Sequence, residues 1–292
     1  MANRALAGII TEMIDADRVC LPVHPELFGQ VKACLADDDL RSHRLWALVG
    51  KDPALICRLL RAANSSFYAG LPKTLSIEEA VTRLGHDQAI RIVEEACRSS
   101  DCHVEGKLVS CYLPGLWQHA QGCAVGARWL ARRCDCLALV DQAYVAGLLH
   151  DIGKLVLLAA LQTVASDSEP DMELSESLVR EVLSTMHVEQ GLRLFDEWHL
   201  PEVYRAVVLQ HHAEELESQD TMLALVKLAN SGCRKIGLGL DKNPDMALPT
   251  TGEAQFLGID EIALAEFEIM LEDRFFGSRV VAKGGPDSSN SV

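Results

Sequence analysis

Apolar residues recur at helical spacing along almost the whole chain, and strand-like alternation of apolar and polar residues is nearly absent. Asp52-Pro53 is typical of a helix start, because aspartate caps a helix and proline suits its first turn. The apolar residues that follow fall on one helical stripe: Leu55, Ile56, Leu59, Leu60 and Ala63. Ser76 and Glu79 form a second start signal, a capping box. The chain is therefore predicted to be all-α.

Clusters of glycine, proline and polar residues divide this helical pattern. The cluster at 99–114 predicts a boundary between two lobes, and that at 237–258 predicts an irregular loop. The polar segment 166–176 predicts a surface connection. After the first lobe we expect helices at these ranges: 116–133, 141–161, 187–198, 201–212 and 260–276. The expected domains are a helical N-terminal lobe at 1–110, a helical bundle at 111–276 and a disordered tail at 277–292.

Composition excludes several classes of protein. Hydrophobic residues make up 49% of the 292 residues, which excludes a wholly disordered chain. The net charge of −15 argues against a nucleic-acid partner, and no apolar stretch of membrane-spanning length predicts a membrane anchor. Ten scattered cysteines in a chain of this length predict free thiols in a reducing compartment. We therefore expect a cytoplasmic protein.

The run from Gly147 to Lys154 contains His150 and Asp151 among apolar residues. An imidazole and a carboxylate are costly to bury unless they share a metal ion or a hydrogen-bond network. Further histidines on predicted helices are the other candidate ligands: His119, His187, His211 and His212. Imidazoles with one carboxylate suit Fe, Mn, Zn or Ni better than Ca. Because a single helical histidine is more often a surface or core residue, the metal site and the ordinary interpretation both stay open.

Three other features carry weaker signals. Asp241, Asn243 and Asp245 imitate the start of a calcium loop that lacks its glycine and its final glutamate, so a surface loop is favoured. Cys134 and Cys136 lack the spacing of a zinc or redox pair. In the first lobe a helix ends in a polar rim, which is either a solvated cap or a surface for a partner or ligand: Arg58, Arg61 and Asn64, with Ser65 and Tyr68.

Three segments together resemble one known family. AGLLHDIGKLVLL resembles the signature of the HD superfamily of metal-dependent phosphohydrolases. KDPALICRLLRAANSSFYAG with SIEEAVTRLG, and MHVEQGLRLFDEWHLPEVYRAVVLQHH, resemble the HDOD family, the HD-related output domain of bacterial signalling proteins. The resemblance covers roughly residues 15–275. It implies a regulatory N-terminal lobe and an HD-like C-terminal lobe.

The resemblance also implies roles for individual residues. In HD hydrolases a histidine, a His-Asp pair and a later aspartate bind the metal, and the first three correspond to His119, His150 and Asp151. Asn230 stands at the position of the later aspartate, and an uncharged amide binds a divalent ion more weakly. His187, His211 and His212 are weaker candidates, which could complete a site of the two-metal kind found in some HD phosphodiesterases. The Gly-Tyr-Pro signature of the cyclic-dinucleotide phosphodiesterases does not occur in the sequence.

These observations leave three hypotheses. The first is a signalling protein that acts through a protein partner, either a different protein or a second copy of the chain, with a degenerate or partial metal site. The second is a metal-dependent phosphohydrolase acting on a nucleotide or another phosphate ester, with Asp151 as metal ligand and Lys154 holding the anionic substrate. The third is a sensor that binds a metal or nucleotide without turnover. The sequence favours the non-catalytic hypotheses, because of Asn230.

Overall fold

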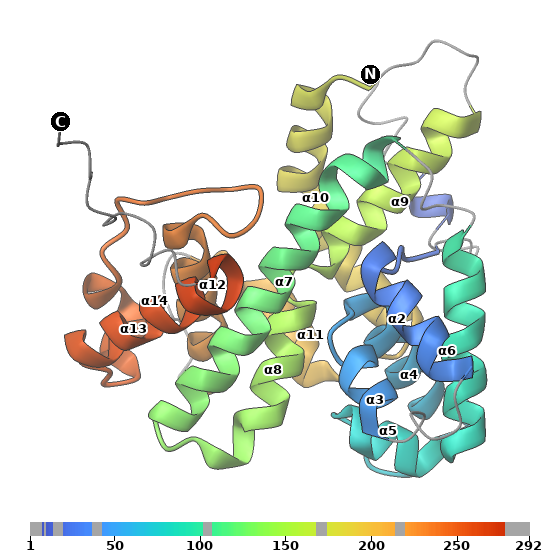
Figure 1. Ribbon diagram of the computed structural model, residues 1–292, viewed down its shortest axis with the longest axis horizontal. Helices are drawn as coiled ribbons and strands as arrows, with labels where there is room; N and C mark the ends of the chain where they lie inside the picture. The colour runs from blue at the N-terminus through green and yellow to red at the C-terminus, as the bar shows by residue number, and fades with distance from the viewer. Residues whose placement is uncertain are drawn as a thin grey trace, which may run out of the picture.

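The computed structural model is helical throughout the part of the chain that it describes, so the all-α prediction is confirmed (Figure 1). The structure describes residues 8, 10–13, 20–36, 43–101, 107–167, 174–213 and 220–277. The predicted tail lies outside these residues, except for Gly277. The helices form two lobes, which lie side by side in Figure 1.

The first lobe begins with α2 and α3 and ends with the long helix α6. Its elements are α2 (Pro25–Ala36), α3 (His43–Val49), α4 (Pro53–Ala63), η1 (Ser66–Tyr68), α5 (Ile77–Leu84) and α6 (His86–Asp101). Asp52 caps α4, since its carboxylate accepts hydrogen bonds from the backbone N–H groups of Ala54 and Leu55. Ser76 caps α5, and Glu79 accepts a hydrogen bond from the N–H of Leu75. Both predicted helix starts are confirmed.

The second lobe is built around α7, which runs through the middle of the molecule (Figure 1). Its elements are α7 (Lys107–Arg133), η2 (Leu137–Leu139), α8 (Val140–Leu149), α9 (Ile152–Asp167), α10 (Glu176–Glu197), α11 (Glu202–Gln210), α12 (Thr221–Ile236), η3 (Leu248–Thr250), α13 (Gly252–Phe256) and α14 (Glu261–Phe276). Helix α7 packs against α8, α9, α12 and α14. Side chains from α7 therefore reach the centre of the lobe.

Several element boundaries differ from the prediction. Helix α6 extends to Asp101 and α7 already begins at Lys107, so Pro114 lies inside a helix, which tolerates it at the loss of one backbone hydrogen bond. Helix α10 begins at Glu176, eleven residues before the predicted start at His187. The predicted loop 237–258 contains η3 and α13. The helix predicted at 141–161 is two helices, α8 and α9, and the break falls at His150 and Asp151.

One continuous set of buried apolar side chains spans both lobes. Polar contacts also join them. The Tyr204 hydroxyl of α11 donates to the carbonyl of Leu75, and the Gln121 amide of α7 donates to the carbonyl of Lys51. Where one lobe ends and the other begins in the sequence, predicted at 110, stays a prediction.

The polar residues at the end of α4 make contacts with other parts of the protein. Arg58 and Arg61 lie 5.9 Å and 4.7 Å from the ring of Trp198, which follows α10, so they join the two lobes. Asn64 is buried, and its side-chain amide exchanges hydrogen bonds with the backbone of Thr74. This placement gives Asn64 a structural part in the first lobe instead of a place on a partner surface.

The segment Leu137–Ala165 is long and apolar enough, by composition, to cross a membrane, although the sequence predicted no such segment. It comprises η2, α8 and α9, and 89% of its apolar window is buried inside the protein. Burial on this scale is typical of a helix pair in the core of a folded lobe. We therefore assign this segment to the core.

Candidate metal centre

Asp151 lies at the break between α8 and α9, where two glycines allow neighbouring helices to approach closely. A Cβ atom on Gly147 would lie 2.6 Å from the carbonyl oxygen of Cys123 on α7. A Cβ atom on Gly153 would lie 1.8 Å from the carbonyl oxygen of His187 on α10. Only glycine fits either position. The two glycines of the Gly147–Lys154 run therefore bring α7 and α10 up to the His-Asp pair.

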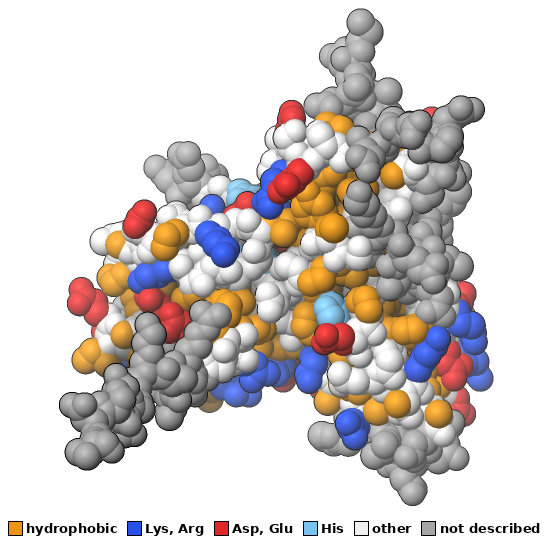
Figure 2. All heavy atoms as spheres, turned by 45° about the horizontal axis from the view of Figure 1, so that its top comes forward, with side chains coloured by type: hydrophobic (Ala, Val, Ile, Leu, Met, Phe, Trp, Pro, Cys, Tyr) orange, Lys and Arg blue, Asp and Glu red, His pale blue; other side chains and the backbone are white. Residues whose placement is uncertain are grey.

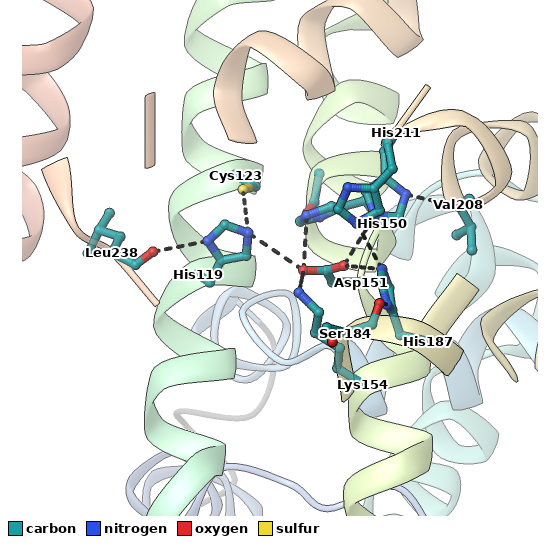
Figure 3. Close-up of polar contacts among 12 residues, drawn as sticks. His119, Cys123, His150, Asp151, Lys154, Ser184, His187, Val208, His211 and Leu238 are labelled. Carbon is teal, nitrogen blue, oxygen red and sulfur yellow. Dashed lines mark hydrogen bonds and ion pairs between the residues drawn. The ribbon is translucent and has the colours of Figure 1, made fainter. Parts of the chain in front are cut away.

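Four histidines surround the Asp151 carboxylate (Figure 3). The Oδ2 atom lies 3.6 Å from Nε2 of His119 and 3.5 Å from Nε2 of His150. The Oδ1 atom lies 3.4 Å from Nε2 of His187 and 3.2 Å from Nε2 of His211. His212 completes the group, since its Nε2 lies 2.9 Å from Nε2 of His187. The structure thus brings together all six residues that were singled out as candidate ligands.

The other ring nitrogen of each of these four histidines lies beside a backbone carbonyl. Nδ1 of His150, His187 and His211 lies 2.8–3.0 Å from the carbonyl oxygen three residues earlier. Nδ1 of His119 lies 3.1 Å from the carbonyl oxygen of Leu238. In a neutral ring Nδ1 therefore donates its proton to the carbonyl, and Nε2 carries the free lone pair. This is the tautomer in which a histidine binds a metal through Nε2.

Burial keeps four of the histidine rings of the centre uncharged at neutral pH: those of His119, His150, His187 and His212. Burial lowers the pKa of His119 and holds the pKa of His150 well below its usual range. It also lowers the pKa of His187 and that of His212 to about 4. The centre therefore presents imidazole lone pairs at neutral pH, in the protonation state that metal binding requires.

Asp151 stays ionised in spite of its burial. Burial alone would raise its pKa, but Lys154, His150 and His211 outweigh burial and hold the pKa of the carboxyl well below its usual range. Nζ of Lys154 lies 2.7 Å from Oδ2, so Lys154 neutralises one side of the carboxylate. Oδ1 faces His187 and His211.

Three buried atoms at the centre have no hydrogen-bond partner: Nε2 of His150, Nε2 of His211 and Oδ1 of Asp151. All three are acceptors in the protonation states described above, so they cannot satisfy one another. Buried polar groups in native proteins are nearly always satisfied, and a shared cation would satisfy all three. The residues present therefore fit a bound metal ion.

The candidate ligands form two groups on either side of Asp151. Asp151, His187, His211 and His212 can each place a ligand atom within 4.8 Å of the others, and so can His119, Cys123 and His150. Sequence reasoning missed Cys123, whose Sγ lies 3.6 Å from Nε2 of His119. The available signal was its position four residues after His119, on the same helical face.

A cavity of about 180 Å³ opens beside the centre. Its wall contains His119, Asp151, Lys154 and His212, together with Asn230 and Arg234 of α12. Asn230 therefore lies at the same cavity as three candidate ligands, His119, Asp151 and His212. Arg234 is a further residue that sequence reasoning missed, and its buried Nε has no hydrogen-bond partner.

Comparisons with known proteins agree with this fold. The chain is 25% identical over 235 residues to an uncharacterized protein of Treponema pallidum, and this match covers 78% of the chain but 44% of that relative. The chain thus spans less than half the length of this relative. The crystal structure of the MmoQ response regulator from Methylococcus capsulatus is similar, with a TM-score of 0.66, 22% identity, and coverage of 85% of this chain and 97% of that one.

A virulence factor from Campylobacter jejuni has a similar fold, with a TM-score of 0.55, 14% identity, and coverage of 87% of this chain and 98% of that one. At these identities the solved structures show the fold alone. The model of the HDOD domain matches residues 21–214, which is well over half of the chain and includes the His-Asp pair and all five histidines of the centre. The chain therefore belongs to the HDOD domain family.

Proposed function

We propose that this protein is a signalling protein that holds a divalent transition metal in its His-Asp centre and acts through protein contacts instead of hydrolysis. The observation that carries the proposal is Asn230, an amide in the wall of the cavity beside Asp151 and His119. The centre offers neutral imidazoles and one carboxylate, which suits Fe, Mn, Zn or Ni. Without a second carboxylate the centre holds less negative charge, so it binds a divalent ion more weakly than a site with an aspartate at position 230 would.

An exposed apolar stripe on α14 supports action through protein contacts. Ile262, Ile269 and Phe276 follow one another at seven-residue spacing, and their exposed fractions are 72%, 57% and 36%. Residues at this spacing share one face of a helix and are typical of helix-to-helix contacts between chains. The stripe would contact a protein partner or a second copy of this chain. Substituting Ile262 and Ile269 by glutamate is expected to abolish the contact and the cellular signal, with metal content unchanged.

The first experiment measures the metal content of protein purified without chelators or nickel resin. We expect about one or two equivalents of metal in the wild type, and none in the Asp151→Ala variant. Metal-free wild-type protein with native circular dichroism would contradict the metal site.

The second experiment tests the proposed part of Asn230. The wild type should show no turnover on a broad panel of phosphate esters with Mn, Mg or Fe, while Asn230→Asp should bind metal more tightly. Asn243→Asp makes the same chemical change outside the centre and serves as the matched control. Turnover by the wild type, abolished in Asp151→Ala, would overturn the non-catalytic proposal.

A metal-dependent phosphohydrolase is the second candidate function. Lys154 and Arg234 both line the cavity beside Asp151, so a phosphate group there would meet two cations. A bound metal would supply an activated water, and Lys154 would hold the anionic substrate. The phosphate-ester panel described above decides between the two candidates.

We also propose that the protein works in the cytoplasm of a bacterium. The nine cysteines within the described part of the chain are all free thiols, which suits a reducing compartment.

A further inference from the structure

A second and larger cavity, of about 540 Å³, lies between the two lobes, away from the metal centre. The first lobe contributes α3, the turn after it and the start of α5, and the second lobe contributes α7, α8 and α14. A cavity of this size is typical of a site for a small organic ligand. Figure 2 shows Lys and Arg side chains gathered along the lower edge of the molecule, beside the notch between its two halves.

The wall of this cavity is positively charged, although the chain carries a net charge of −15. Four cationic residues line it, against two acidic ones, Glu78 and Asp141: Lys51, Arg128, Arg132 and Arg274. Arg128 pairs with Asp141, with 3.3 Å between Nη2 and Oδ1. Among the described residues no carboxylate forms an ion pair with the other three cations. A local excess of cations in an acidic protein favours an anionic ligand.

Three aromatic side chains line the same cavity. Trp46 comes from the first lobe and packs edge-on against His86. Trp129 of the second lobe packs against Phe267, which fixes its ring. Tyr144 lies beneath the guanidinium of Arg128, with 4.0 Å between Cζ and the ring centre. Fixed aromatic rings provide stacking surfaces for a planar group.

One further observation points to a ligand in this cavity. Nε of Arg128 is buried and has no hydrogen-bond partner, which leaves one strong donor unsatisfied.

We propose that this cavity binds a nucleoside phosphate. The base would stack on Trp46 and Trp129, which reach the cavity from opposite lobes, and the phosphate would bind Lys51, Arg132 and Arg274. A planar group and an anionic group in one molecule match the two kinds of side chain in this wall. The proposal does not rest on the metal centre, because no residue of that centre lines this cavity.

The test titrates ATP, GTP and AMP into the full chain in buffer with EDTA, so that no metal contributes, and follows binding by calorimetry and tryptophan fluorescence. Adenosine and inorganic phosphate serve as half-ligands. At least one nucleotide should bind saturably, about tenfold or more tightly than either half-ligand. It should also quench fluorescence, because two of the four tryptophans line the cavity.

Substituting Arg132 and Arg274 together by glutamine should weaken binding about tenfold or more, because each exposed guanidinium contributes to phosphate binding. Arg133→Gln is the matched control. It removes an exposed arginine from the same helix, and that arginine pairs with Glu266 and lies outside the cavity wall. The control should bind as the wild type does. Absence of saturable binding by all three nucleotides, or equal affinity in the Arg132→Gln/Arg274→Gln variant, would overturn the proposal.

Discussion

Each lobe buries a group of polar side chains around an aspartate, and the two groups differ in how their hydrogen bonds are satisfied. In the first lobe Asp52 accepts hydrogen bonds from the backbone N–H groups of His24, Ala54 and Leu55. In the second lobe Asp151 is surrounded by imidazoles whose free lone pairs, like its own, are acceptors.

This difference indicates a structural role for the Asp52 group and a functional role for the Asp151 group. The Asp52 group stabilises the fold, because donors and acceptors match within the protein. The Asp151 group costs stability while its acceptors face one another, and it gains stability when a cation binds. Both aspartates are buried, so burial does not distinguish the two groups. Their surroundings do, because hydrogen-bond donors surround Asp52 and acceptors surround Asp151.

The largest effect is expected from metal binding to the second group. Saturating Mn or Zn, at roughly a thousand times the dissociation constant, should raise the free energy of unfolding by about 4 kcal/mol. Asp151→Asn should abolish that gain, and its metal-free stability should fall below that of the wild type, because the largely buried Lys154 side chain loses its ion-pair partner. Urea unfolding with and without metal measures both quantities. An equal gain in the variant would show that the metal binds elsewhere.

A smaller loss is expected when the first group is disrupted. Asp52→Ala removes a buried cap and leaves backbone N–H groups unsatisfied, which should cost about 3 kcal/mol of unfolding free energy without changing metal content. Ser76→Ala, which removes the more exposed cap of α5, is the matched control and should cost about 1 kcal/mol. If Asp52→Ala lost no more unfolding free energy than Ser76→Ala, the burial of the Asp52 cap would not increase its contribution to stability.

The smallest effect is a difference in how the two groups respond to pH in metal-free protein. The pKa of His187 is lowered to about 4, so below pH 6.5 the unfolded chain gains the proton first and stability falls as the pH is lowered. Between pH 6.5 and 5 this contribution is about 2 kcal/mol. It is measured as the difference in unfolding free energy between the wild type and His187→Gln.

Asp52 changes the stability with pH in the direction opposite to His187, because burial raises the pKa of the Asp52 carboxyl to about 6. The folded protein then takes up the proton first, so stability gained at low pH is lost as the pH rises from about 4 to 6. Comparison of the wild type with Asp52→Asn isolates this contribution. If the contributions of His187 and Asp52 to the unfolding free energy changed with pH in the same direction, the predicted contrast between the two groups would be wrong.

Short-range patterns in the sequence predicted the helical class, the caps Asp52 and Ser76, and the His150-Asp151 pair. These features depend on neighbours within about one helical turn, so the sequence displays them directly. The break at His150 was not predicted, because apolar residues continue through 141–161 without a turn signal. The start of α7 at Lys107 was not predicted, because proline is unfavourable inside a helix and Pro114 therefore indicates a boundary.

The sequence by itself thus determined an all-α chain and six candidate ligands, together with the resemblance that places Asn230 among them. Only the tertiary structure decided that their lone pairs converge, that Cys123 joins them and that two tryptophans from different lobes line one cavity. The physical reason is that these arrangements depend on how closely helices cross. Gly147 and Gly153 permit the crossings at the metal centre, but the distances exist only once α7, α8, α9 and α10 are packed together.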